Sequence, residues 1–255
     1  MTTPAARLAS APFEVIGRFA DASNATLLVR LTDRDDVPLG DDVDFVDLDP
    51  DDLAVYKPKR GEAPLWDFAP GTLHRREVAA YAVSEALGWD LVPPTVLRSD
   101  GPFGAGSLQR YVPHDPERHY FTVLEEGRPD LLAQLRAMVV FDLVIDNADR
   151  KGGHVLVEDV LGDERIRVVD HGVSFNVDRK LRTVAWDFAH EPIPSDLLAA
   201  VGSLAPALAG DRGDRLRGLL TAPEIAVLAR RVAEVADLDT FPPPIGPRPF
   251  PWPLL

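Results

Sequence analysis

The order of predicted strands and helices is the feature that most constrains how this chain can fold. The first half contains short runs with the alternating or β-branched pattern of strands. These runs are residues 13–19, 25–31, 53–58, 95–97 and 106–112. One helix is predicted among them, over residues 72–87, with Thr72 as its N-cap and Gly88 as its C-terminal stop. The first half is therefore predicted to form a β-sheet with one inserted helix.

The second half has a different pattern, in which helices dominate. A helix capped by Asp130 is predicted over residues 131–145, because apolar residues recur there at helical spacing. A polar, glycine-bearing loop over residues 146–153 (DNADRKGG) follows it. Two β-branched strands come next, over residues 154–158 and 165–170. The remainder of this half is predicted to be helical, and its last helix is capped by Thr221.

These patterns predict an α+β fold with a β-rich N-lobe over residues 1–112 and a mainly helical C-lobe over residues 113–240. A tail over residues 241–255 (FPPPIGPRPFPWPLL) follows, and its seven prolines exclude a helix or a central strand. We predict that this extended tail packs on the body through Phe250 and Trp252. The alternative is that the tail binds a partner as a proline-rich ligand.

Charge narrows the choice of partners. The formal net charge is −14, so broad electrostatic binding to nucleic acid or to anionic lipid surfaces is not expected. Ten aspartates fall within residues 33–52, which we interpret as a solvated acidic insertion. Calcium binding is the alternative, although the Asp-x-Asp spacing comes without the glycine and the terminal glutamate of an EF-hand loop.

Composition also bears on location. The sequence contains no cysteine, which excludes disulfides, thiolate metal sites and cysteine nucleophiles. Residues 197–210 are too few and too rich in Gly and Pro to form a transmembrane segment. The N-terminus lacks the apolar core of a signal peptide. A cytoplasmic location is therefore expected.

Three side chains near the 146–153 loop could carry phosphoryl-transfer chemistry. Transfer from ATP needs hard ligands for the metal that bridges the phosphates, a fixed cation, and a base for the acceptor hydroxyl. Asp149 lies in the loop, His154 begins the next strand, and Asp170 ends the strand after it. Because the hairpin returns the chain, these side chains can meet at one end of it. His154 and Asp170 are reasonable ligands for Mg²⁺ or Mn²⁺.

Other residues could supply the cations and the nucleotide contacts. Lys57, on a predicted strand of the first half, would serve as the phosphate cation, and Glu77 in the predicted helix is the natural carboxylate to hold it. Arg150 and Lys151 could offset the negative charge that gathers in the loop. The segment connecting the two halves has backbone groups that could read an adenine edge; it consists of Gln109, Arg110, Tyr111 and Val112.

Four segments together resemble the phosphatidylinositol 3- and 4-kinase superfamily, and most closely the type II phosphatidylinositol 4-kinases and their bacterial relatives. They are VYKPK (residues 55–59), SLQRYV (107–112), DNADRKGGHVLV (146–157) and VVDHGVSFN (168–176). HipA-type protein kinases share the layout more distantly. The resemblance covers residues 13–194 and implies a two-lobed, protein-kinase-like fold that binds ATP and Mg²⁺ or Mn²⁺.

The resemblance also implies roles for single residues. Asp149 is implied to be the catalytic-loop aspartate, Asp170 the metal ligand of the Asp-x-Gly turn, and Lys57 the phosphate lysine. Residues 20–24, which include Ser23 and Asn24, are implied to cover the phosphates. Two departures stand out: His154 replaces the asparagine usual at that position, and the covering turn has no glycine.

Two further functions are open at this stage. One is a nucleotide-binding pseudokinase with little or no turnover, in which His154 marks the loss. The other is a metal-dependent phosphohydrolase. Its candidate ligands are Asp142, Asp146, Asp149, His154, Asp170 and His171. The acceptor of a kinase, whether lipid, protein or small molecule, is not identified by the sequence.

Overall fold

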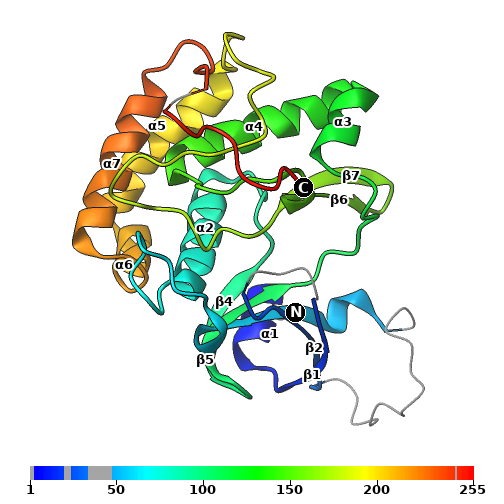
Figure 1. Ribbon diagram of the computed structural model, residues 1–255. Coiled ribbons are helices and arrows are strands. Elements are labelled where there is room, and N and C mark those ends of the chain that lie inside the picture. Colours follow the sequence, from blue (N-terminus) through cyan, green and yellow to red (C-terminus); the bar gives the residue numbers. More distant parts are fainter. Residues whose placement is uncertain (1–2, 20–23, 34–47, 245) are drawn as a thin grey trace. The chain divides into compact units, whose positions relative to one another are not determined.

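The computed structural model describes residues 3–19, 24–33, 48–244 and 246–255 (Figure 1). The chain divides into two compact units. Unit 1 contains residues Met1–Val78 and Pro93–Pro113, and unit 2 contains Ala79–Val92 and His114–Leu255. The division differs from the predicted lobes in one respect, since residues 79–92 belong with the second unit. Their buried side chains and the backbone of Leu91, whose carbonyl accepts from the N–H of Val168, pack within unit 2.

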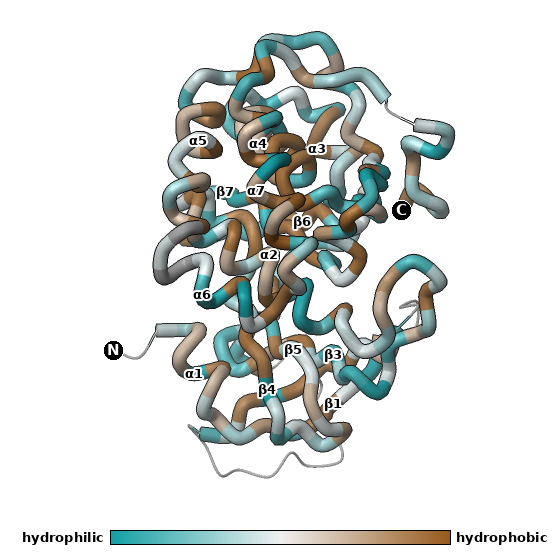
Figure 2. Tube along the Cα trace, turned by 90° about the vertical axis from the view of Figure 1, so that its left-hand side faces the viewer, coloured by the Kyte–Doolittle hydropathy of each residue, from teal (hydrophilic) through white to brown (hydrophobic). Residues whose placement is uncertain are grey.

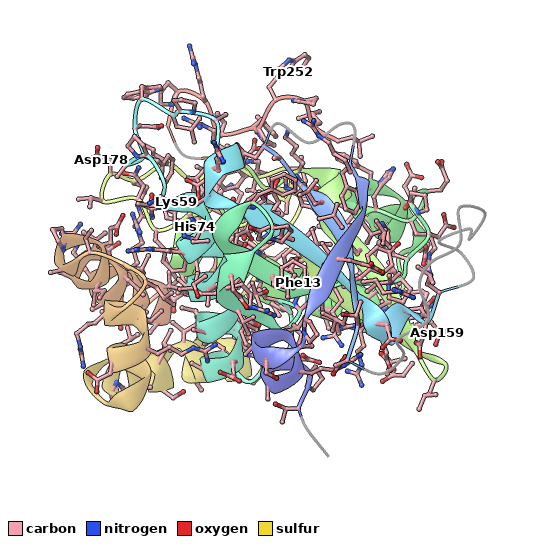
Figure 3. The ribbon with its side chains drawn as sticks, turned by 90° about the horizontal axis from the view of Figure 1, so that it is seen from below. Phe13, Lys59, His74, Asp159, Asp178 and Trp252 are labelled. Atoms are coloured by element: carbon pink, nitrogen blue, oxygen red, sulfur yellow. The ribbon has the colours of Figure 1, made fainter. Side chains whose placement is uncertain are left out.

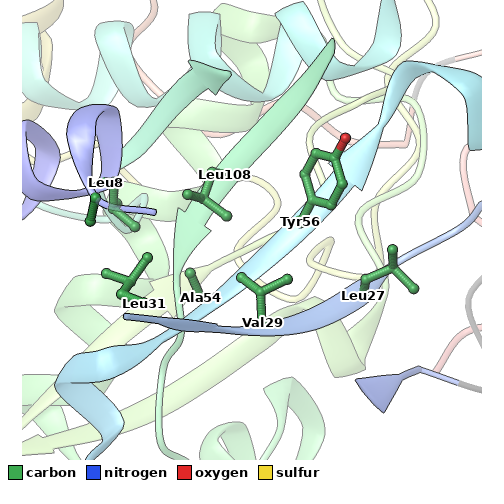
Figure 4. Close-up of a cluster of buried hydrophobic side chains, with 8 residues drawn as sticks. Leu8, Leu27, Val29, Leu31, Ala54, Tyr56 and Leu108 are labelled. Carbon is green, nitrogen blue, oxygen red and sulfur yellow. The ribbon is translucent and has the colours of Figure 1, made fainter. Parts of the chain in front are cut away.

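Unit 1 is built on an antiparallel five-stranded sheet in the order β1-β2-β3-β5-β4. Its elements are α1 (Pro4–Ser10), β1 (Phe13–Arg18), β2 (Leu27–Leu31), β3 (Leu53–Pro58), β4 (Thr95–Gly101) and β5 (Gly104–Arg110). Alternate residues of β2 are fully buried, as expected of a sheet with one face on a core. The core cluster joins the sheet to α1 and consists of Leu8, Ala11, Leu27, Val29, Leu31, Ala54, Tyr56 and Leu108 (Figure 4).

Helix α2 (Leu73–Leu87) continues from unit 1 into unit 2. Thr72 does not cap it in the predicted manner, because its hydroxyl donates to the carbonyl of Ala69. The backbone N–H of His74 is instead accepted by the carboxylate of Glu62, at 2.9 Å. A glutamate eleven residues before the helix thus satisfies one of its first N–H groups.

Unit 2 is mainly helical, as predicted, and contains one β-hairpin. Its elements after α2 are α3 (Tyr120–Glu126), α4 (Pro129–Ile145), β6 (Val155–Val160), β7 (Asp163–Val168), α5 (Ser195–Ala209), α6 (Asp211–Arg217) and α7 (Ala222–Ala236). Helix α4 is apolar along most of its length (Figure 2) and is buried on nearly all sides from Leu135 onward. Thr221 caps α7 as predicted and forms a capping box with Glu224.

Two predictions about unit 2 need correction. Asp130 is not the cap of α4: Arg128 takes that position, Pro129 is the first helical residue, and Asp130 lies in the first turn. Residues 171–194 were predicted to be helical but form no helix. Within the described residues, no helix is both long enough and apolar enough to cross a bilayer.

The tail is held differently from the prediction. Phe250 is 50% exposed and Trp252 is 87% exposed, so neither ring anchors it. Figure 3 shows Trp252 at the edge of the molecule. Pro251 is the buried tail residue in this stretch. Phe241, at the start of the tail, is buried, and its backbone N–H donates to the carbonyl of Glu191. Farther along, the carbonyls of Pro249 and Leu254 accept hydrogen bonds from the body of unit 2.

Candidate functional site

Unit 1 contains the predicted lysine–glutamate pair. Tyr56 of β3 is buried in the core, so the strand's period of two places the next residue, Lys57, on the opposite face of the sheet. The Nζ of Lys57 lies 2.6 Å from Oε1 of Glu77 on α2. The Glu77 side chain is only 3% exposed. The ion pair therefore fixes the partly exposed ammonium group against a carboxylate that is shielded from water.

In the segment predicted to read an adenine edge, residues 109–112, several hydrogen-bond donors are already used within unit 1. The amide of Gln109 donates to the hydroxyl of Thr95 at 2.8 Å. The backbone N–H of Arg110 donates to Pro94, and that of Tyr111 donates to Leu53. These donors serve unit 1, and contact between this segment, including Val112, and a nucleotide stays a prediction.

The predicted phosphate-covering turn falls mainly outside the described residues. Ser23 is among the residues that the structure does not describe. Asn24 is described, and its side-chain oxygen accepts from the backbone N–H of Ala63 at 2.7 Å. Asn24 thus contacts the segment after β3.

In unit 2, the β6–β7 hairpin brings His154 and Asp170 together. Val155 pairs with Val168 at the end of the hairpin, and the N–H of Val169 donates to the carbonyl of His154 at 3.0 Å. Nε2 of His154 lies 3.4 Å from Oδ2 of Asp170. The convergence expected from the sequence is present in the structure.

The geometry of this pair suits a divalent cation. Two neighbouring ligands on an octahedral ion, each about 2.1 Å from it, stand about 3.0 Å apart, close to the observed separation. The backbone of Asp170 has φ of +61°, a left-handed conformation that Asp tolerates better than most residues and that is often found at functional sites. Within the described residues, no group of three or more His, Asp or Glu side chains forms a complete metal cage. A site of this kind needs phosphate and water oxygens to complete its coordination.

Asp149 has the properties of a proton acceptor. Burial raises its pKa to about 6, and the nearby carboxylate of Asp170 adds to the increase, while Lys151 opposes it. Nζ of Lys151 lies 3.6 Å from Oδ2 of Asp149, which agrees with the prediction that this lysine offsets charge in the loop. The Asp149 side chain keeps 33% of its surface exposed, so an incoming hydroxyl can reach it. A carboxylate with a pKa near neutrality is suited to general-base catalysis.

Arg150 does not face the reacting groups, contrary to the prediction. It is fully buried, and its guanidinium group is bound bidentately by Asp142 at 2.8 and 3.0 Å. The same group donates to the carbonyl of Val169 at 2.9 Å and lies 2.8 Å from Nε2 of His171. Arg150 therefore joins three elements, namely α4, the 146–153 loop and the turn after β7, and positions Asp149 and Asp170.

A second buried arginine holds the start of the loop. Arg231 of α7 lies 3.0 Å from Oδ2 of Asp146, and each side chain is 2% exposed. The backbone N–H of Lys180 donates to the same oxygen at 2.9 Å. Asp146, with φ of +55°, is the residue at which α4 ends in a left-handed conformation. The pair thus joins the end of α4 to α7 and to the segment that follows β7.

Comparison with known proteins identifies one close relative. No protein-family model matches the chain. Protein Rv2133c of Mycobacterium tuberculosis is 41% identical to it, and the aligned region covers 96% of this chain and 93% of that protein. The chain belongs to the Rv2133c family.

Solved structures show what fold this member of the Rv2133c family has. The proinflammatory kinase CtkA of Helicobacter pylori matches with a TM-score of 0.53 over 91% of this chain and 94% of its own, at 12% identity. Fam20 from hydra, solved with sugar, matches with a TM-score of 0.51 over 90% and 85%, at 16% identity. Sequence identity this low shows the fold alone. The fold is kinase-like, with an antiparallel sheet in one part and helices in the other, as predicted.

The two buried arginines in this Rv2133c-family chain argue against the phosphohydrolase alternative. That alternative requires Asp142 and Asp146 as metal ligands, but Arg150 and Arg231 already bind their carboxylates in the interior. Removing a carboxylate from such a pair leaves a buried charge uncompensated, which is costly. Among the phosphohydrolase candidates, Asp142, Asp146 and His171 thus contact buried arginines within the described residues.

Sequence reasoning missed Arg231, although a signal was present. Arg231 falls four residues after Val227 and four before Val235, which are buried on the inner face of α7. An arginine on an apolar helix face requires a buried partner, because an isolated charge there is strongly unfavourable. The sequence did not show which of its many aspartates that partner would be.

Proposed function

We propose that the chain is an ATP- and divalent-metal-dependent phosphotransferase that transfers the γ-phosphoryl group to an alcohol acceptor, within a phosphatidylinositol 3-/4-kinase-like superfamily. The kinase-like fold supports phosphotransferase or pseudokinase chemistry at the level of fold. The finer assignment rests on the side chains described above. We also expect the protein to act in the cytoplasm.

The Lys57–Glu77 ion pair is the observation that carries this proposal. An exposed ion pair contributes little to stability, and burying a carboxylate has a large desolvation cost. A contribution to stability therefore does not by itself explain why this pair is present. In a kinase-like fold, a carboxylate on the helix holds a strand lysine ready to bind the phosphates of ATP. The 2.6 Å contact between β3 and α2 meets that requirement.

The residues of unit 2 have distinct roles in this proposal. Asp149 accepts the proton of the acceptor hydroxyl, and Lys151 limits the rise of its pKa. Asp170 and His154 would hold Mg²⁺ or Mn²⁺. When bound, the metal neutralises charge on the phosphate oxygens of the nucleotide. Arg150 holds the loop that contains Asp149 next to the turn that contains Asp170, through its contacts with Asp142 and Val169.

Thermal unfolding with nucleotide and metal tests the proposal. ATP with Mg²⁺ or Mn²⁺ should raise the melting temperature, and Asp170→Ala should abolish the metal-dependent part of that rise. Lys57→Met should weaken ATP binding. Asp196→Asn, on the exposed surface of α5, is the matched control and should behave as the parent does. The absence of any shift at millimolar nucleotide would contradict the proposal.

Release of ADP tests turnover on candidate acceptors, which are inositol lipids, protein hydroxyls and small alcohols. Asp149→Asn should lower the rate by about 10²–10⁴-fold, the usual contribution of a general base, while ATP binding is kept. An unchanged rate in Asp149→Asn on a confirmed acceptor would show that another group is the base.

A pseudokinase is the second candidate, and the contact between His154 and Asp170 favours it. At 3.4 Å, a protonated imidazole would occupy the carboxylate oxygen that a metal needs. The two candidates differ in one measurement. Tight ATP binding with no transfer to any acceptor, in both Mg²⁺ and Mn²⁺, would identify the pseudokinase.

A further inference from the structure

We infer that the surface of unit 2 formed by Phe121, Gly152, Thr183 and Trp186 is a docking surface for an extended polypeptide acceptor, and that tail residues 249–255 occupy it in the absence of that acceptor. The inference rests on the proposed phosphotransferase function. It adds a protein as the class of acceptor and the tail as its competitor.

Among the described residues, three hydrogen bonds join tail residues 249–255 to the body of unit 2, and the body supplies the donor in each of them. The carbonyl of Pro249 accepts from the backbone N–H of Thr183 and from Nε1 of Trp186, both at 3.0 Å. The carbonyl of Leu254 accepts from the backbone N–H of Gly152 at 2.7 Å. The tail contributes only backbone carbonyls, which every polypeptide has. An extended segment of different sequence can therefore replace it.

The large apolar side chains of the tail are also largely exposed, as expected of a segment that another polypeptide can replace. Trp252 points to the periphery of the molecule (Figure 3), and Phe250, Leu254 and Leu255 are each at least 41% exposed. A segment whose purpose was to complete the core would bury these large apolar groups, since their burial is its main source of stability. The tail therefore docks mainly through its backbone and Pro251 and leaves at least 41% of each of these four residues exposed.

The surface adjoins the loop that carries the proposed base. Gly152 lies three residues after Asp149 and has no side chain, and a methyl group added there would stand 2.8 Å from Phe121 and 2.9 Å from Leu255. Thr183 is joined to the other side of the loop through a parallel bridge with Arg150. In Figure 1, the red tail ends beside β6 and β7, the hairpin that begins after this loop. A polypeptide bound on this surface would therefore run beside the loop that carries Asp149.

The docked tail does not cover the side chain of Asp149, the proposed base. Asp149 keeps a third of its side-chain surface exposed while the tail is docked. Water or a small alcohol can therefore reach the carboxylate, whereas a polypeptide meets the tail. The tail is thus expected to discriminate by the size of the acceptor and not to switch off ATP turnover as a whole.

A cleavable tail tests the inference without removing any part of the chain. A site for a specific protease is inserted after Gly246, an exposed turn residue with φ of +82°, and each sample is assayed before and after cutting. The acceptor probes are a degenerate peptide mixture with one Ser, Thr or Tyr, soluble short-chain phosphatidylinositol, and glycerol. Cutting should raise peptide phosphorylation at least fivefold and leave transfer to glycerol unchanged. A synthetic peptide of residues 247–255 should restore the uncut rate.

Variants of the uncut protein provide the controls. Trp186→Phe removes one of the two donors to Pro249 and keeps the ring, so its rate on peptides should fall between those of the uncut and cut forms. Trp252→Ser changes an exposed ring and should leave every rate as in the parent. A cut that raises transfer to the inositol lipid and not to peptides would overturn the assignment of a protein acceptor. A cut that lowers all rates would show that the tail supports the active structure.

A binding measurement separates failure of this inference from failure of the proposed function. Fluorescently labelled peptide 247–255 should bind the cut protein and be displaced by the degenerate peptides, whether or not turnover occurs. If ATP does not bind and no acceptor is phosphorylated in either form, the proposed function fails. If ATP turns over but the labelled peptide does not bind, the inference fails and the function stands.

Discussion

The ionised form of Asp149 is less stable than that of an exposed aspartate. Burial raises its pKa to about 6, so the native protein binds a proton there more tightly than the unfolded chain does. Below pH 4 the carboxyl is protonated in both states and has no differential effect. As pH rises through 6 the native state must ionise a poorly solvated group, and stability falls. The same property makes the group a base near neutral pH.

Asp149→Asn should therefore stabilise the metal-free protein in a pH-dependent way. We expect its melting temperature to exceed that of the parent at pH 8, by a margin that shrinks towards pH 5 and vanishes near pH 4, because the amide never ionises. Calorimetry in the presence of a chelator measures this difference. Asp196→Asn is the control, and a margin independent of pH would show that the burial of Asp149 is not its cause.

His154→Asn tests the metal preference of the site. An amide oxygen in place of an imidazole nitrogen gives a harder ligand, which Mg²⁺ prefers. The variant should bind nucleotide better with Mg²⁺ than the parent does, and its advantage with Mn²⁺ should shrink. Titrating each metal against the ATP-dependent rise in melting temperature gives the ratio of apparent affinities. An unchanged ratio would indicate that His154 does not contact the metal.

At the scale of elements, α4, the 146–153 loop and the β6–β7 hairpin are joined by the buried Asp142–Arg150 pair. Arg150→Met should lower the free energy of unfolding by about 3–5 kcal/mol, since it leaves the Asp142 carboxylate without its cation. The double variant Asp142→Leu/Arg150→Met should lose less than the single one. Arg217→Met, on the exposed face of α6, should change stability by about 1 kcal/mol or less. Denaturant unfolding measures all three, and an additive double variant would contradict the coupling.

The elements differ in how far the sequence predicts them. β3 and the residues that β6 and β7 bring together could be predicted, because their β-branched runs and short turn are local signals. Residues 171–194 were predicted incorrectly as helical, since they take their structure from distant contacts such as Arg182 with Asn147. The Lys57–Glu77 contact was predicted from the requirements of phosphoryl transfer. The partners of Asp142 and Asp146 were not, because polar pairs separated by up to 85 residues leave no local pattern.

At the scale of the whole molecule, one arginine of unit 1 forms ion pairs with an aspartate near each end of the acidic segment. Arg7 of α1 contacts Asp33 and Asp52, each at 2.7 Å. Residues 34–47 lie outside the described residues, and both the acidic-insertion interpretation and its calcium alternative remain predictions. The guanidinium group of Arg7 brings the two flanking aspartates close enough for a short connection.

Replacing residues 35–47 with a short Gly-Ser linker should therefore leave unit 1 folded. The replacement removes six aspartates and changes the formal net charge from −14 to −14 + 6 = −8, which lessens repulsion among like charges. We expect a melting temperature equal to or slightly above that of the parent, measured with and without calcium. Arg7→Met, which removes the guanidinium contact with both flanking carboxylates, should lower it. Loss of folding in the deletion variant would show that the segment is structural.

The course of the chain through the two units also has a consequence for synthesis. Unit 1 is complete once residue 113 has left the ribosome, but residues 79–92 belong to unit 2 and must wait for the 142 residues that follow. At about 5–20 residues per second this takes roughly 7–28 s. During that interval Val83, Leu87 and Leu91, all buried in the finished protein, have no partners from unit 2. The second half of α2 is thus the part of the nascent chain where a chaperone has the longest opportunity to bind.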